Sequence, residues 1–168
     1  IVALLDLRPG QRVLEIGCGW GTLAAELARR CGVSVVGVTL STEQLAFARE
    51  RAAQWGVADR VDLRLQDYRD VEGQFDRIVS IEMIEAVGEA FWPTYFATLR
   101  ERLLPGGHAL LCLTTPKLDL AFLRDLVATE APGLDWLERL PNPAVFDDIS
   151  PDRALKVVVC RRRDSDTA

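Results

Sequence analysis

Short apolar runs alternate along this chain with segments long enough to form helices, and this alternation constrains the fold more than any other feature. The apolar runs have the roughly four to eight residues that buried strands need. They are residues 12–16, 33–40, 60–66, 74–81, 108–113 and 154–160, and the helix-length segments are residues 21–31, 41–55, 91–104 and 119–131. Such alternation is typical of a parallel sheet covered by helices on both faces. We therefore predict an α/β fold with a mostly parallel sheet.

Local signals mark several ends of these elements. Ser41 is a candidate N-cap, and Gln44 three residues later would complete a capping box. Pro93 falls in the first turn of the third helix, and the Gly106-Gly107 pair ends that helix before the next strand. Residues 134–140 fit a strand or a helix, and the Pro- and Asp-rich residues 141–151 are expected to form a loop.

Length and composition exclude several classes of protein. The 168 residues fit one domain, because a domain usually takes about 150. Apolar residues make up 49% of the chain, which is too many for a disordered tail, yet no run approaches the roughly 18–20 apolar residues of a membrane helix. The net charge of −5 disfavours nucleic-acid binding. Contact with a membrane surface stays open, and the residues do not define an oligomeric state.

The cysteines indicate where the protein works. Cys18, Cys31, Cys112 and Cys160 show no CxxC spacing and no partner histidine, so we expect no zinc or other metal site. Free thiols next to apolar runs are typical of a reducing compartment, and we expect a cytoplasmic protein. Because the chain opens with isoleucine and its sole methionine is Met83, residues 1–168 are expected to be a single domain excised from a longer chain.

A glycine-rich turn follows the first strand and carries the clearest chemical signal. Gly17, Gly19 and Gly21 are spaced so that a cofactor could approach the backbone closely where a helix begins. A dinucleotide fingerprint needs glycine at position 22, which is Thr22, and an acid after the second strand, which is absent. The spacing E-x-G-x-G-x-G, beginning at Glu15, is instead the methyltransferase variant that holds the methionine part of S-adenosylmethionine. A tight turn without any ligand is the remaining alternative.

The glycine-rich turn is the first of four segments that occur in order: residues 17–21 (GCGWG), 36–44 (VGVTLSTEQ), 65–70 (LQDYRD) and 75–81 (FDRIVSI). Together they resemble the cyclopropane-fatty-acid synthase family, including its mycolic-acid relatives, among the class I S-adenosylmethionine-dependent methyltransferases. The resemblance covers about residues 4–115. It implies a Rossmann-like, seven-stranded sheet with strand order 3-2-1-4-5-7-6, in which residues 154–160 lie antiparallel beside residues 108–113.

The resemblance also assigns residues to the cofactor, S-adenosylmethionine. The loop after the first strand would hold it, Thr39, Leu40 and Gln44 would contact the ribose and its surroundings, Gln66 and Asp67 would lie along the adenine, and Ile81 would pack nearby. The alternatives without a cofactor are that Gln44 only caps a helix and that Thr39 is an ordinary strand residue. The predicted cofactor-binding residues are Val13, Glu15, Ile16, Gly17, Cys18, Gly19, Trp20, Gly21, Thr39, Leu40, Gln44, Gln66, Asp67 and Ile81.

At the catalytic end the chain departs from the family pattern. Members of the family bind bicarbonate, and Glu85 falls on the position of a carbonate-binding glutamate. Ala86 and Cys112 stand where the family has histidines, and His108 lies four residues before Cys112, about 13 Å along a strand. We therefore predict that Glu85 is catalytic and lines the substrate pocket, and that any requirement for bicarbonate is weak or absent. Glu82 is a second candidate base or substrate anchor.

Two functions from different classes follow. The leading one is an S-adenosylmethionine-dependent methyltransferase that transfers a methyl or methylene group to a lipid or another small-molecule acceptor. Such transfer needs little from the protein beyond alignment of the reacting atoms, because the sulfonium supplies the driving force. The alternative is a non-catalytic cofactor-binding or interaction domain of a larger protein.

Overall fold

The computed structural model describes residues 2–113, 119–138 and 156–164, and in them strands and helices alternate as the sequence predicts. Two short 3-10 helices, Tyr68–Asp70 and Glu89–Phe91, join the longer elements. The strands are β1 (Arg12–Ile16), β2 (Ser34–Thr39), β3 (Val61–Leu65), β4 (Phe75–Ile81), β5 (Leu103–Leu113), β6 (Leu134–Glu138) and β7 (Lys156–Arg162). The α-helices are α1 (Val2–Leu5), α2 (Thr22–Cys31), α3 (Thr42–Gln54), α4 (Ile84–Val87), α5 (Trp92–Arg102) and α6 (Leu120–Glu130).

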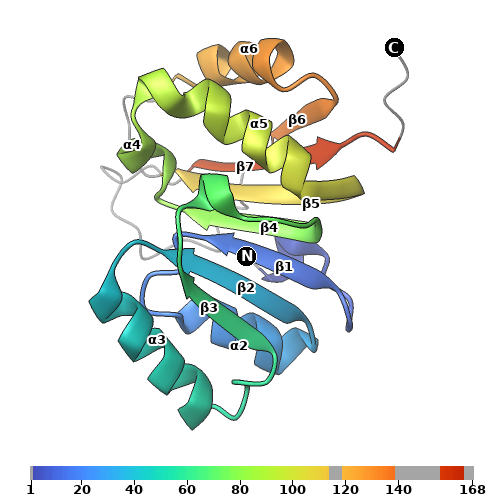
Figure 1. Ribbon diagram of the computed structural model, residues 1–168. Coiled ribbons are helices and arrows are strands. Elements are labelled where there is room, and N and C mark those ends of the chain that lie inside the picture. Colours follow the sequence, from blue (N-terminus) through green and yellow to red (C-terminus); the bar gives the residue numbers. More distant parts are fainter. Residues whose placement is uncertain (1, 114–118, 139–155, 165–168) are drawn as a thin grey trace.

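The seven strands form one sheet with the order β3-β2-β1-β4-β5-β7-β6, which confirms the predicted fold class (Figure 1). Strand β1 pairs in parallel with β2 on one side and with β4 on the other. Strand β7 pairs antiparallel with both β5 and β6. The predicted antiparallel placement of the last strand is therefore confirmed.

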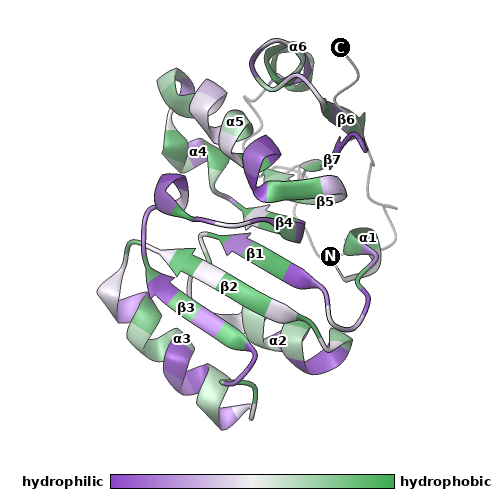
Figure 2. Cartoon of the chain, turned by 45° about the vertical axis from the view of Figure 1, so that its right-hand side comes forward, coloured by the Kyte–Doolittle hydropathy of each residue, from purple (hydrophilic) through white to green (hydrophobic). Residues whose placement is uncertain are grey.

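Helices cover both faces of the sheet and leave two cores, which Figures 1 and 2 show from different sides. Alternate residues of β1 serve the two cores: Val13 lies with α2 and α3, whereas Leu14 and Ile16 lie with α5 and α6. All three side chains are at most 1% exposed. This burial on both faces explains why β1 is almost continuously apolar.

The structure differs from the sequence prediction at several boundaries. Strand β5 begins at Leu103, which pairs with Phe75, and residues 104–107 bulge before the ladder resumes at His108. Residues 134–138 form a strand, while the loop expected over residues 141–151 lies outside the described residues. The short helices α1 and α4 were not predicted. Across the described ranges, no helix has the length and apolar character that crossing a bilayer requires.

Candidate cofactor site

A cavity of about 690 Å³ opens at the carboxyl ends of β1, β2 and β4, directly beside the glycine-rich turn. Parallel neighbours flank β1 on both sides, and open α/β sheets bind ligands at such a point. The volume lies within the usual range for small-molecule sites. Its lining residues are Ile16, Gly17, Gly19, Val38, Thr39, Leu40, Ser41, Gln44, Gln66, Asp67, Tyr68, Arg69, Ile81, Glu82, Met83, Ala86, Val87 and Phe91.

The glycine-rich turn adopts a conformation that side chains would disturb. Gly17, Gly19 and Gly21 all have positive φ angles, of 77°, 50° and 72°. A Cβ atom on Gly21 would lie 2.5 Å from Cβ of Ala48, so this glycine allows α2 and α3 to approach each other. A Cβ on Gly19 would meet no atom of the described residues within 4 Å and would project into open space. Gly19 thus leaves room for a ligand beside the backbone.

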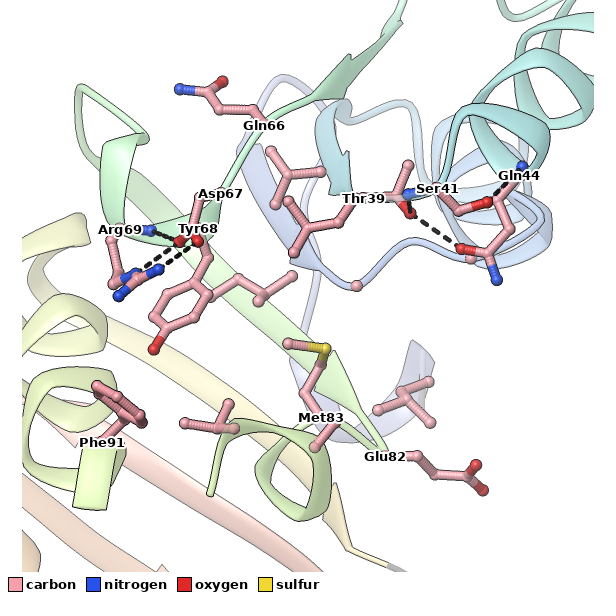
Figure 3. Close-up of a pocket in the computed structure, with 18 residues that line it drawn as sticks. Thr39, Ser41, Gln44, Gln66, Asp67, Tyr68, Arg69, Glu82, Met83 and Phe91 are labelled. Carbon is pink, nitrogen blue, oxygen red and sulfur yellow. Dashed lines mark hydrogen bonds and ion pairs between the residues drawn. The ribbon is translucent and has the colours of Figure 1, made fainter. Parts of the chain in front are cut away.

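One wall of the cavity is polar and rests on the turn between β2 and α3. Thr39 Oγ1 donates a hydrogen bond of 2.9 Å to Gln44 Oε1 and accepts one of 3.2 Å from the Ser41 N–H (Figure 3). Ser41 caps α3 as predicted, since its Oγ accepts from the Gln44 N–H at 3.1 Å. The predicted capping box is nevertheless incomplete, because the Gln44 side chain bonds to Thr39. Helix capping alone therefore does not account for the position of the Gln44 side chain.

A second polar group lies at the start of the 3-10 helix after β3. The Asp67 carboxylate accepts hydrogen bonds from Nε and Nη2 of Arg69 at 2.9 and 2.7 Å (dashed lines in Figure 3). These bonds lower the pKa of Asp67 below its ordinary value, so the group carries its charge at neutral pH. The Gln66 amide donates to the Asp70 carbonyl at 2.7 Å, and its side chain points away from the cavity in Figure 3.

The opposite wall is mainly apolar and comes from the end of β4 and from α4. Met83, Ala86 and Val87 share one face of this short helical segment, because positions three and four apart are neighbours on a helix. Met83 lies against the glycine-rich turn, where a Cβ on Gly17 would meet its sulfur at 2.6 Å. Glu82 has a φ angle of 54°, rare for a residue with a side chain, and its carboxylate points away from Met83 (Figure 3).

Glu85 is not among the residues that line the cavity, and its predicted catalytic role stays a prediction. Its side chain is exposed, and the next residue, Ala86, does line the cavity. The charge of Glu85 instead acts on Tyr95, whose pKa is raised first by burial and to a smaller extent by Glu85. Glu82 is the acidic residue of this turn that lines the cavity.

Five of the residues predicted to bind the cofactor do not line the cavity. Val13 is fully buried within β1, before the end of the strand that borders the cavity. The Cys18 side chain packs toward Gly37. Gly21 is the N-cap of α2, and Trp20 turns outward with 53% of its surface exposed. The fifth, Glu15, points to the α2 side of the sheet.

Glu15 supports the turn from behind. Its carboxylate is 4% exposed and accepts a hydrogen bond from the Ala24 N–H in the first turn of α2, while Oε2 has no partner among the described residues. Burial raises the pKa of Glu15 to about 8, and the bond from Ala24 opposes this increase. Glu15 therefore fixes where α2 begins relative to β1 and holds the turn in place.

The other nine predicted residues do line the cavity: Ile16, Gly17, Gly19, Thr39, Leu40, Gln44, Gln66, Asp67 and Ile81. Their contact with a cofactor stays a prediction. Sequence reasoning missed seven lining residues: Val38, Ser41, Tyr68, Arg69, Met83, Val87 and Phe91. Tyr68 and Arg69 come directly after Asp67 and could have been found from that position. Cys112 is a packed thiol, as expected, and burial raises its pKa to about 11.

Strand order, glycine-rich turn and cavity together define the fold of class I S-adenosylmethionine-dependent methyltransferases. The chain overlays on the cyclopropane synthase MmaA2 from Mycobacterium tuberculosis with a TM-score of 0.65 and 31% identity, over 77% of this chain and 50% of that one. A mycolic acid cyclopropane synthase, CmaA1, in complex with SAH and CTAB gives a TM-score of 0.64 at 27% identity, over 78% of this chain and 51% of that one.

Sequence comparison defines the family. The model of the mycolic acid cyclopropane synthetase family matches residues 1–131, and the chain belongs to this family. It is 50% identical over 117 residues to tuberculostearic acid methyltransferase UfaA1 of Mycobacterium tuberculosis, covering 67% of this chain and 27% of that protein. The cyclopropane-fatty-acyl-phospholipid synthase of Escherichia coli is also 50% identical over 117 residues, covering 69% and 30%. The chain thus spans less than a third of the length of these two relatives.

Proposed function

We propose that this chain is the cofactor-binding core of an S-adenosylmethionine-dependent methyltransferase that acts on a lipid acceptor. The observation that carries the proposal is the cavity beside the glycine-rich turn, with a polar wall and an apolar wall facing each other across it. The names of the relatives support the lipid acceptor, since the Escherichia coli enzyme is named a cyclopropane-fatty-acyl-phospholipid synthase and UfaA1 a tuberculostearic acid methyltransferase.

The residues present fit this cofactor. The open space in front of Gly19 can take the methionine part, since within the described part of the chain no atom lies where a side chain would project. The Thr39–Gln44 pair offers a hydroxyl and an amide to the ribose hydroxyls, and Asp67 stands at the far end for the adenine. When bound, the cofactor would supply an activated methyl group on a sulfonium centre.

The chain's own contribution would be alignment and exclusion of water. Met83, Ala86, Val87 and Phe91 make an apolar wall that can hold an acyl chain next to the glycine-rich turn. Glu82 is the carboxylate that can accept a proton or anchor the acceptor on this side. Glu85, the glutamate that the family resemblance assigns, would have to act from outside the observed wall.

A transfer assay tests the proposal. The protein is incubated with S-adenosylmethionine labelled in its methyl group and with vesicles of an unsaturated phospholipid, and lipid products are detected by mass spectrometry. Glu82→Gln is expected to lower transfer at least tenfold, with unchanged cofactor affinity measured by calorimetry. Glu85→Gln is the matched comparison at the other candidate carboxylate, and omission of bicarbonate tests the carbonate requirement.

The outcomes separate the two classes of function. Labelled lipid that disappears in Glu82→Gln supports the methyltransferase with Glu82 as the acting carboxylate, and loss in Glu85→Gln alone would return that role to Glu85. Cofactor binding without transfer to any lipid would favour the non-catalytic alternative.

All four cysteines are free thiols, which supports our placement of the protein in the cytoplasm.

A further inference from the structure

A stripe of aromatic and arginine side chains runs along α3 from the edge of the cavity. Phe47, Arg51 and Trp55 follow the cavity residue Gln44 at intervals of three and four, so they share one face of the helix. Trp20, from the glycine-rich turn, meets Phe47 edge to face with ring centroids 5.4 Å apart. Trp20 is 53%, Phe47 44% and Trp55 36% exposed. We call Trp20, Phe47, Arg51 and Trp55 the α3 stripe.

Arginine charge is held directly over these rings. The Arg51 guanidinium lies 4.8 Å from the ring centroid of Phe47 and 5.8 Å from that of Trp55. It donates hydrogen bonds to the Trp20 carbonyl and to the Thr22 hydroxyl, both of which are neutral groups. Arg29 on α2 lies 5.7 Å from the Trp55 ring, although Glu26 pairs with it at 3.0 Å. Cationic side chains thus frame an exposed aromatic surface on a chain of net charge −5.

We propose that the α3 stripe docks on the surface of an anionic phospholipid membrane. Trp and Phe side chains favour the boundary between head groups and acyl chains, and a stacked guanidinium matches a lipid phosphate. The position of the stripe fits this partner, because Leu40, 74% exposed, lines the cavity and directly precedes the N-cap of α3. A docked membrane would lie close to the cavity that an acyl chain must enter. The inference rests on the proposed lipid acceptor.

Vesicle sedimentation tests the docking surface. The chain is mixed with vesicles of phosphatidylcholine alone or with added phosphatidylglycerol, and the bound fraction is measured at increasing lipid concentration. The double variant Phe47→Ser/Trp55→Ser is expected to bind the anionic vesicles about tenfold more weakly, because it removes two apolar anchors. Phe122→Ser is the matched control, since Phe122 is 55% exposed but lies on α6, on the opposite face of the sheet. Circular dichroism verifies that each variant is folded.

The proposal is supported if the wild-type chain and Phe122→Ser both sediment with anionic vesicles and the double variant does not. Absence of sedimentation, or equal binding by the double variant, overturns it. Self-association that the double variant abolishes, without vesicle binding, would make the stripe an interface between copies. Calorimetry with S-adenosylmethionine on the same samples keeps the proposed function separate: vesicle binding without cofactor binding contradicts the function and leaves the docking surface standing.

Discussion

Replacing Glu15 by glutamine is expected to change how the stability of this protein depends on pH. Glu15 is 4% exposed beneath the glycine-rich turn, and burial raises its pKa from an ordinary value of 4.5 to about 8. A glutamine keeps the side-chain oxygen that accepts the Ala24 N–H. The substitution therefore removes the buried ionisation and little else.

The direction of the effect follows from proton linkage. The folded state holds its proton on Glu15 up to a higher pH than the unfolded chain does, so the free energy of unfolding falls as pH rises from 4.5 to about 8. Each pKa unit corresponds to about 1.4 kcal/mol, which sets the largest loss at ~5 kcal/mol. That loss is large for a domain whose total stability is on the order of 5–15 kcal/mol. The Glu15→Gln variant should not show this loss of stability with rising pH.

Urea unfolding followed by circular dichroism at several pH values between 5 and 9 measures the difference. At pH 5 the two proteins should agree within about 1 kcal/mol, because protonated Glu15 and glutamine are both uncharged and both keep an oxygen that accepts the Ala24 N–H. At pH 9 the variant should be several kcal/mol more stable. Glu130→Gln, on an exposed side chain at the end of α6, controls for the loss of one carboxylate. A difference between wild type and Glu15→Gln that stays constant from pH 5 to 9 would refute the reasoning.

Three further predictions concern the cavity. Gly19→Val should abolish binding of S-adenosylmethionine in calorimetry, because the valine side chain would fill the space in front of the turn. The φ angle of 50° at this position also disfavours branched residues. Binding at wild-type affinity would contradict this prediction. Gln44→Leu should weaken binding about tenfold through loss of the amide that faces Thr39, whereas Gln54→Leu on the same helix should not. Arg69→Ala should raise the pKa of Asp67, which Arg69 holds low, and a carboxyl titration by NMR that shows no increase would be evidence against this ion pair.

The fold could be predicted almost completely from the sequence, because strand and helix periods differ and β1 is buried on both faces. The start of β5 could not, since Leu103 joins the ladder through one pair with Phe75 and residues 104–107 then bulge. No hydrophobic period marks such a bulge. The placement of β7 came from the family resemblance rather than from the pattern of its residues.

The candidate site was predicted in outline but not in the direction of its side chains. The family resemblance placed Glu85 on the turn after β4, yet in that turn Ala86 lines the cavity and Glu85 does not. Glu15 and Trp20 belong to the expected loop, but the pleat of β1 turns the first toward α2 and the conformation of the turn exposes the second. Periodicity cannot supply this information where an element has fewer than two turns.

Calorimetric titration of the 168-residue chain with S-adenosylmethionine, its demethylated product and NAD tests the central claim most directly. We expect saturable binding of the first two ligands at micromolar concentrations and loss of this binding in Gly19→Val. Tight binding of NAD, with no heat on addition of S-adenosylmethionine or its product, would contradict it.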